Sequence, residues 1–334
     1  MQGFRLEARD EYPHRLTPEP TFNESVYTNA FDPVLGMGGW MRIGNRANEG
    51  YAEVSVCLYL PDGRLACQFA RAPIDGNGQF SAGGLSVTVV EPLEALDMAY
   101  DGELMVLDDP QALRRPETLS DVAKRVPASV RWSHVGVSPI HGGEPTSPDQ
   151  PTMYGRDFSL GHFNQHTRVA GEIRIGEEVW PFNGSGWRDH SWGPRQWQAI
   201  RSYRLFLANF GDGRGFMLLK IGAPDGGSRR VGVLMVDGAY EEIIDLDVLT
   251  REWTSGKTPS RMLIGARTAR RAVLIEGEAL NVAPLRNRRR IGDELVISNI
   301  SEAFTRFRWD GAEGLGMSEY IDRIEAGELA GYPL

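Results

Sequence analysis

The sequence predicts an all-β protein built as two successive antiparallel halves. Short runs that alternate apolar and polar residues recur with turn signals roughly every ten residues. Several neighbouring runs flank Asp-Gly turns, and no long stretch has the periodicity of an amphipathic helix. A chain of 334 residues is long enough for two domains. We therefore expect two packed barrels or sandwiches, and a barrel of about eight strands has room for one small ligand.

The composition excludes several classes of partner. A net charge of −9 argues against nucleic acid, because nucleic-acid binding depends on neutralising phosphates. No run approaches the ~20 apolar residues of a membrane helix. The first ten residues carry no secretory signal, so we expect a cytoplasmic protein without a membrane span. No cysteine and histidine set has zinc spacing and no loop has a phosphate-binding pattern, so we expect neither metal nor cofactor.

The first half is expected to fold over residues 21–140, after a polar N-terminal arm at 1–20 that contains three prolines. The runs on either side of Pro61-Asp62-Gly63-Arg64 predict a hairpin, in which Cys57 and Cys67 could face each other as reduced thiols. Residues 108–125 break the alternation and allow one or two short helices. The strands expected in this half are 21–27, 36–43, 51–60, 65–70, 85–90, 98–100, 103–107 and 128–137.

The second half is expected to follow a link at 141–155, where prolines and glycines replace apolar residues. Residues 156–334 then form a second domain that repeats the hairpin pattern. The strands expected in this half are 168–175, 178–182, 203–210, 215–221, 230–236, 241–246, 261–268, 272–280, 295–303 and 305–309.

The most informative run is Gly184–Trp197, which holds three tryptophans, an aspartate, a histidine and two arginines between glycines. Such a mixture either builds a buried polar network or lines a cavity, because unpaired charges and indole N–H groups are costly to bury. If the run is extended, Trp187 and Asp189 share one face and Arg188 and His190 share the other. Gly193 and Pro194 are expected to end the regularity.

An acid among indole rings suggests proton-transfer chemistry. A buried carboxylic acid can stay protonated and can protonate an alkene, and indole faces stabilise the cation that forms. We expect Asp189 to be the proton donor, with His190 as a base or as the group that orients it. Candidate ligand contacts are Trp187, Trp192, Trp197, Tyr203, Trp40, Tyr27, His134 and His166, with His162 beside the last of these.

A structural alternative remains open for the same residues. Arg188 and Asp189 could form an ion-paired latch, and Arg195 could pair with Glu24 or Glu319. A carboxylate beside an arginine is held ionised and cannot act as a proton donor.

The run Gly184-Ser-Gly-Trp-Arg-Asp-His-Ser-Trp-Gly-Pro-Arg195 resembles the signature of the carotenoid 1,2-hydratase and AttH-like superfamily, and more closely its largely uncharacterised bacterial branch. Asn23-Glu24-Ser25, Phe163-Asn-Gln-His166 and Gly314-Leu-Gly-Met-Ser-Glu-Tyr320 agree with it. The resemblance implies two consecutive lipocalin-like (calycin) β-barrel domains and apolar, polyene-like or terpenoid substrates. The chain departs from the carotenoid enzymes at Arg188 and at Pro194-Arg195.

These observations together predict a cofactor-independent lyase, hydratase or isomerase. Its partner would be a hydrophobic small molecule, such as a terpenoid, steroid or aromatic compound, protonated in a Trp-lined cavity. The alternatives are a non-catalytic lipocalin-like carrier of the same ligands and a scaffold with a filled interior. A homodimer stays open as an assembly state.

Overall fold

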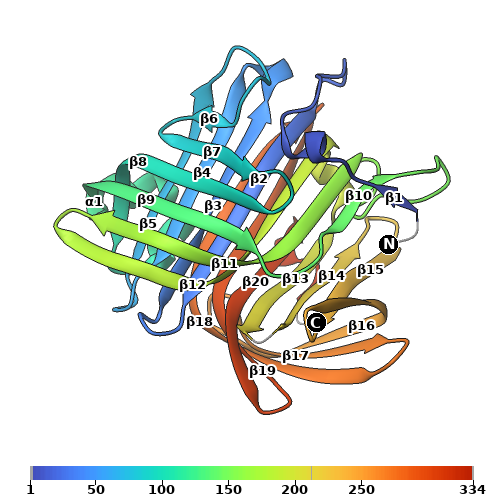
Figure 1. The fold of residues 1–334 in the computed structure, drawn as a ribbon. Coiled ribbons are helices and arrows are strands. Elements are labelled where there is room, and N and C mark those ends of the chain that lie inside the picture. The colour runs from blue at the N-terminus through green and yellow to red at the C-terminus, as the bar shows by residue number, and fades with distance from the viewer. Residues whose placement is uncertain (1–2, 212, 333–334) are drawn as a thin grey trace. The chain divides into compact units, whose positions relative to one another are not determined.

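The computed structural model describes residues 3–211 and 213–332, which divide into two compact units (Figure 1). The first unit takes in the chain up to Leu107 and then Ala123–Trp197. The second takes in Asp108–Val122 and the chain from Gln198 onward. Each unit has its own sheet and its own core.

The first unit is one 12-stranded antiparallel sheet, in the order β1-β10-β11-β12-β2-β3-β4-β5-β8-β7-β6 with β9 beside β8 and β11. Because β9 pairs with both β8 and β11, the sheet closes into a barrel of the strands β11, β12, β2, β3, β4, β5, β8 and β9. The elements up to the unit boundary are β1 (Phe4–Arg5), η1 (Ala8–Glu11), β2 (Phe22–Asp32), β3 (Met37–Arg46), η2 (Ala47–Glu49), β4 (Tyr51–Tyr59), β5 (Leu65–Pro73), β6 (Ser81–Ala82), β7 (Leu85–Glu91), β8 (Ala95–Leu107), β9 (Lys124–Gly136), β10 (His141–Pro145), β11 (Gly161–Ile175), β12 (Glu178–Pro194) and η5 (Trp197–Ala199).

The interior of this barrel is filled by side chains. Val130 and Trp132 of β9, Met98 of β8, Ile173 of β11 and Phe182 of β12 are all buried in one core cluster. They come from alternate positions of their strands, which is the pattern that a half-buried strand predicts. Apolar burial of this kind contributes on the order of 1.5–3 kcal/mol for each large side chain.

The β4–β5 hairpin forms where the sequence predicts it. Gly63 has a φ of +88°, a left-handed conformation that glycine adopts without steric cost and that the tight turn requires. Cys57 and Cys67 are register partners across this hairpin, and both are buried thiols rather than half-cystines. Burial raises the pKa of Cys67 to about 12, so this thiol is unreactive near neutral pH.

The second unit is a 9-stranded antiparallel sheet, in the order β13 through β21, and a further pairing of β13 with β20 closes it into a barrel. Its core holds Phe206, Phe216, Leu234 and Phe307. The elements are η3 (Pro110–Arg114), η4 (Pro116–Thr118), α1 (Leu119–Val122), β13 (Ser202–Gly211), β14 (Arg214–Gly222), β15 (Ser228–Val236), β16 (Ala239–Trp253), β17 (Pro259–Thr268), β18 (Ala272–Ile291), β19 (Glu294–Trp309), β20 (Ala312–Glu325) and β21 (Glu328–Leu329).

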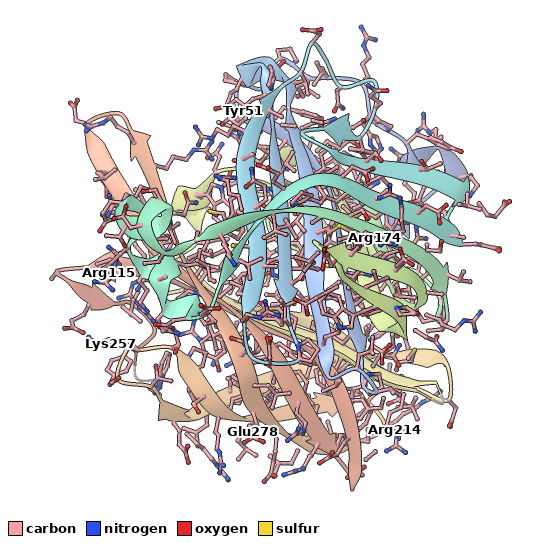
Figure 2. The ribbon with its side chains drawn as sticks, turned by 90° about the vertical axis from the view of Figure 1, so that its left-hand side faces the viewer. Tyr51, Arg115, Arg174, Arg214, Lys257 and Glu278 are labelled. Atoms are coloured by element: carbon pink, nitrogen blue, oxygen red, sulfur yellow. The ribbon has the colours of Figure 1, made fainter. Side chains whose placement is uncertain are left out.

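The predicted fold class is confirmed: the protein is all-β, with two consecutive lipocalin-like antiparallel barrels. The short helices expected at 108–125 are η3, η4 and α1, in the excursion marked by the exposed Arg115 in Figure 2. Asp109 caps η3 by accepting a hydrogen bond from the Gln111 amide at 2.9 Å. No helix among the described residues is long and apolar enough to cross a membrane.

The organisation differs from the prediction in where the two units divide. The link expected at 141–155 contains β10, which pairs with β1 and β11 and so belongs to the first sheet. The strand expected at 178–182 continues to Pro194, and β12 pairs with both β11 and β2. The Gly184–Trp197 run therefore lies in the first unit, although residues 156–334 were expected to form one domain.

Candidate active site

Strand β12 carries the conspicuous run and lies between β11 and β2. The run is extended, and Gly193, whose φ is +124°, and Pro194 end the strand as expected. Gly184 and Gly186 allow a close approach to β2, because a Cβ on Gly186 would lie 2.0 Å from the carbonyl oxygen of Asn29. These two glycines therefore let β12 and β2 pack closely.

The two faces of β12 have different surroundings. Arg188 and His190 are opposite Gln165 and Phe163 of β11 and point toward the side of the filled barrel core. Asp189 points the other way, and its register partners are Asn164 of β11 and Tyr27 of β2. The predicted alternation is confirmed, and we call the side with Asp189 the outer face.

The outer face brings Asp189 next to a histidine. Nε2 of His162 lies 3.4 Å from Oδ2 of Asp189, whose side chain is 19% exposed, whereas that of His162 is 2% exposed. The other ring nitrogen of His162, Nδ1, is 2.9 Å from Sδ of Met153, and the ring of Tyr154 meets the imidazole edge-on at 4.5 Å. We call Asp189 and His162 the proton pair.

Both ring nitrogens of His162 face hydrogen-bond acceptors. A thioether sulfur accepts hydrogen bonds and does not donate them. The two acceptors are therefore the sulfur of Met153 and the carboxylate of Asp189.

Aromatic side chains predicted to contact ligand gather on the same face. His166 of β11 meets Trp187 edge-on, with ring centroids 4.6 Å apart. Tyr27 of β2 stacks on Trp40 of β3, with centroids 6.0 Å apart. Four of the predicted residues thus share the outer face with Asp189.

Arg195 follows β12 and also lies near the proton pair. Its Nη2 donates to Oγ of Ser191 at 2.8 Å, and its guanidinium lies 4.2 Å from the centroid of the Phe158 ring. Burial and the neighbouring charge of Arg42 lower the pKa of Arg195 to about 10, which leaves it charged at neutral pH. Its pairing with Glu24 was predicted, but the Glu24 carboxylate is held by other partners.

The predicted latch between Arg188 and Asp189 is wrong, because adjacent side chains on a strand point in opposite directions. Arg188 instead binds Glu11 of the N-terminal arm, at 2.9 Å and 3.0 Å from the two carboxylate oxygens, and Oε1 of Gln165 at 2.8 Å. The side chains of Arg188 and Glu11 are only 1% and 2% exposed.

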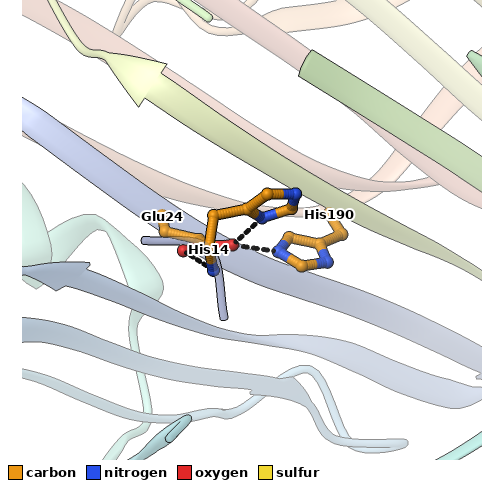
Figure 3. Close-up of side chains that lie close together, drawn as sticks. All are labelled: His14, Glu24 and His190. Carbon is orange, nitrogen blue, oxygen red and sulfur yellow. Dashed lines mark hydrogen bonds and ion pairs between the residues drawn. The ribbon is translucent and has the colours of Figure 1, made fainter. Parts of the chain in front are cut away.

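His190 does not lie beside Asp189 either. Its Nε2 is 2.9 Å from Oε1 of Glu24, and Nδ1 of His14 is 2.6 Å from the same oxygen (Figure 3). Burial by itself would raise the pKa of Glu24, but the hydrogen bonds from the two histidines lower it to about 2. Trp192 stacks on His14 at 4.0 Å and donates its indole N–H to Glu144, so it belongs to this side as well.

The remaining predicted residues lie elsewhere. His134 of β9 is fully buried on the core side, where Nδ1 is 2.9 Å from Oγ1 of Thr167. Burial and the charge of Arg188 lower the pKa of His134 to about 3. Trp197 in η5 meets Phe158 edge-on at 5.3 Å. Tyr203 on β13 and Glu319 on β20 belong to the second unit.

Sequence reasoning missed Glu11 and His14, and it gave Glu24 the wrong partner. Both missed residues come from the segment expected to be a loose arm, and buried Asp10 lies beside them. His162 was noted beside His166 without a role as the partner of Asp189. The available signal was register: a β11–β12 hairpin turning at Gly176-Glu177 places His162 opposite Ser191, next to Asp189.

This chain matches one family model and is similar in fold to several solved structures. Residues 7–324 match the model of a family described as a domain of unknown function (DUF7064). A crystal structure of a candidate AttH protein from Nitrosomonas europaea is similar, with a TM-score of 0.63, 14% identity and 98% of each chain covered. No curated protein is similar enough in sequence to count as a relative.

Two further solved structures share the fold. One is CghA with Sch210972, with a TM-score of 0.56, 11% identity, and 93% of this chain and 95% of that chain covered. The other is kievitone hydratase from Nectria haematococca, with a TM-score of 0.54, 8% identity, and 96% of this chain and 93% of that chain covered. At these identities the likeness establishes the fold.

Proposed function

Since this chain belongs to the DUF7064 family, which brings no activity with it, we propose from the site that the protein is a hydratase or isomerase acting on a hydrophobic small molecule. The observation that carries the proposal is the proton pair on the outer face of β12. A carboxylate and an imidazole 3.4 Å apart are groups that general acid–base catalysis uses, and in the proposed reaction they share the proton that is transferred. Trp187, Tyr27 and Trp40 are the aromatic residues on the same face, and Trp187 and Trp40 are almost fully buried there.

The proposed chemistry begins with transfer of the shared proton to one carbon of an alkene. In a hydration, water then adds to the cation, and the proton that this water loses returns to the pair, so that the net change is addition of water. In an isomerisation, the pair removes a proton from a neighbouring carbon, and the double bond moves. Indole and phenol faces stabilise the intermediate cation.

Two relatives of the fold support this direction. One is by name a hydratase, and the other was solved with the small molecule Sch210972. The chain's own residues supply the proton, so the proposal requires no cofactor. The proposed substrate is of the class expected from the sequence: a terpenoid, steroid or aromatic compound.

The filled interior of the first barrel argues against a carrier of the lipocalin type. Such carriers hold the ligand inside the barrel, and here Trp132, Met98 and Phe182 fill that interior. A ligand on the outer face would instead contact the proton pair.

The test is incubation of the full chain with a panel of lipophilic alkenes and tertiary alcohols in deuterated water. Mass spectrometry then follows deuterium incorporation and the gain or loss of water. We expect at least one compound to be converted by the wild type, and His162→Gln to slow that conversion. Asp101→Asn, which changes an exposed strand aspartate paired with Arg131, should leave the rate unchanged. Binding without conversion across the panel would favour the carrier.

A further inference from the structure

We propose that His14, Glu24 and His190 form a binding site for a divalent transition-metal cation such as Zn²⁺, which fastens the N-terminal arm to the first barrel. The site lies on the opposite side of β12 from the proton pair and is independent of the proposed catalysis. One ligand atom from each residue lies within 4.8 Å of the other two (Figure 3). Two imidazoles and one carboxylate are a ligand set that Zn²⁺ takes in proteins.

The distances suit a cation without a large rearrangement. Oε1 of Glu24 is 2.6 Å from Nδ1 of His14 and 2.9 Å from Nε2 of His190. Ligand atoms about 2.0–2.2 Å from a tetrahedral zinc ion lie about 3.3–3.5 Å from one another. Each separation therefore changes by less than about 1.5 Å.

The outer contacts of the three residues match those of metal ligands. A ligating histidine commonly donates its second ring N–H to a carboxylate, which fixes the ring and its tautomer. Nε2 of His14 is 3.3 Å from Oδ1 of Asp10, whose side chain is 2% exposed. The second oxygen of Glu24, Oε2, accepts hydrogen bonds from the amide nitrogen of His14 and the side-chain amide of Asn77. Nδ1 of His190 has no hydrogen-bond partner among the residues that the structure describes, so this contact of the pattern is unfilled.

The charges point the same way. Asp10 and Glu24 are both almost fully buried, and buried carboxylates need compensating positive charge. One divalent cation bound to the two imidazoles would provide this charge. The charge of nearby Glu11 is already neutralised by Arg188, so Glu11 needs no positive charge from the site.

The sequence did not predict this site because its ligands come from three separate segments: the arm, β2 and β12. No short motif links them. The consequence of binding is mechanical, since the cation would join residue 14 to the strands that carry residues 24 and 190.

The test uses the full chain after removal of metal with a chelator, titrated with Co²⁺ and observed by visible d–d absorption, and with Zn²⁺ by calorimetry. We expect one equivalent to bind, and Zn²⁺ to raise the melting temperature because it binds the folded chain. Affinity should fall as the pH is lowered, because protons compete for the imidazoles.

Three variants give the proposal its sharpest test. His14→Gln should abolish the Co²⁺ spectrum, and Asp10→Asn, which leaves the three ligands in place, should weaken binding about 10- to 100-fold. His141→Gln changes a buried histidine outside the site and should bind as the wild type does, with circular dichroism confirming that each variant folds. The proposal is overturned if the wild type binds no cation, or if His14→Gln binds it with unchanged affinity. Should His14→Gln fail to fold, the Asp10→Asn affinity decides.

Discussion

Arg188 and Asp189 are adjacent in the chain, but their charged groups lie on opposite sides of β12. The guanidinium of Arg188 binds Glu11 at 2.9 Å, and the carboxylate of Asp189 lies 3.4 Å from Nε2 of His162. The strand therefore separates two charged groups that the sequence allows to pair with each other. The arginine binds the N-terminal arm, and the aspartate faces a histidine on the other side of the strand.

The arm contact predicts a large loss of stability for Arg188→Ala. The substitution leaves the Glu11 carboxylate buried without its partner, which costs about 3–5 kcal/mol. Arg174→Ala removes an exposed ion pair with Glu172 and should change the free energy of unfolding by less than about 1 kcal/mol. Urea denaturation of both variants measures the difference. Equal effects would show that the buried pair does not hold the arm.

The close approach of β12 to β2 predicts that Gly186→Ala destabilises the first unit by about 1–3 kcal/mol, since the added methyl group meets a backbone carbonyl that cannot move aside. Gly76→Ala places its methyl group where no atom lies within 4 Å and serves as the control. Thermal unfolding followed by tryptophan fluorescence reports the change. A Gly186→Ala protein as stable as the control would contradict the register of β12 and β2.

His14 predicts a loss of stability at alkaline pH in the metal-free protein. Burial opposes its charge, but hydrogen bonds and charges from Glu24 and Asp10 outweigh burial and raise its pKa above the ordinary 6.5. A raised pKa contributes stability that is fully present below about pH 6.5 and is lost as the pH rises through the folded-state pKa. Urea denaturation across this range, with chelator present, should show the decline in the wild type. His14→Gln should lack it, and a decline of the same size in that variant would assign the effect elsewhere.

His134 predicts the opposite dependence of stability on pH, a loss as the pH falls. Its pKa is lowered to about 3, so the folded protein does not take up a proton there until the pH is far below 6.5. The unfolded chain takes up that proton near pH 6.5, and acid therefore favours unfolding between about pH 6.5 and 3. Proton NMR should find the ring of His134 neutral at about pH 4.5. A titration midpoint near 6.5 would mean that the ring is not buried beside Arg188.

The fold was predictable because its signals are local. Asp-Gly turns and alternating runs located the β4–β5 hairpin, and the period of two correctly placed Asp189 and Arg188 on opposite faces. The boundary between the units was not predictable in the same way. The proline-rich stretch contains β10, and its partners β1 and β11 are far from it in the sequence. Pairing between distant strands depends on tertiary contacts that composition does not encode.

The candidate site was predictable in part for the same reason. Trp187, Tyr27, Trp40 and His166 were named and do share a face with Asp189. Glu11 and His14 were missed because an arm with three prolines has no periodic signal, and its role depends on which barrel residues it meets.

In the proposed reaction, Asp189 and His162 together transfer a proton to the substrate. The most direct measurement is the rate of deuterium incorporation from deuterated water into a converted compound, for the wild type and for Asp189→Asn. General acid catalysis typically contributes about 10²- to 10⁴-fold, so we predict a loss of at least about 100-fold in a variant that folds normally. Full turnover by Asp189→Asn would contradict the account.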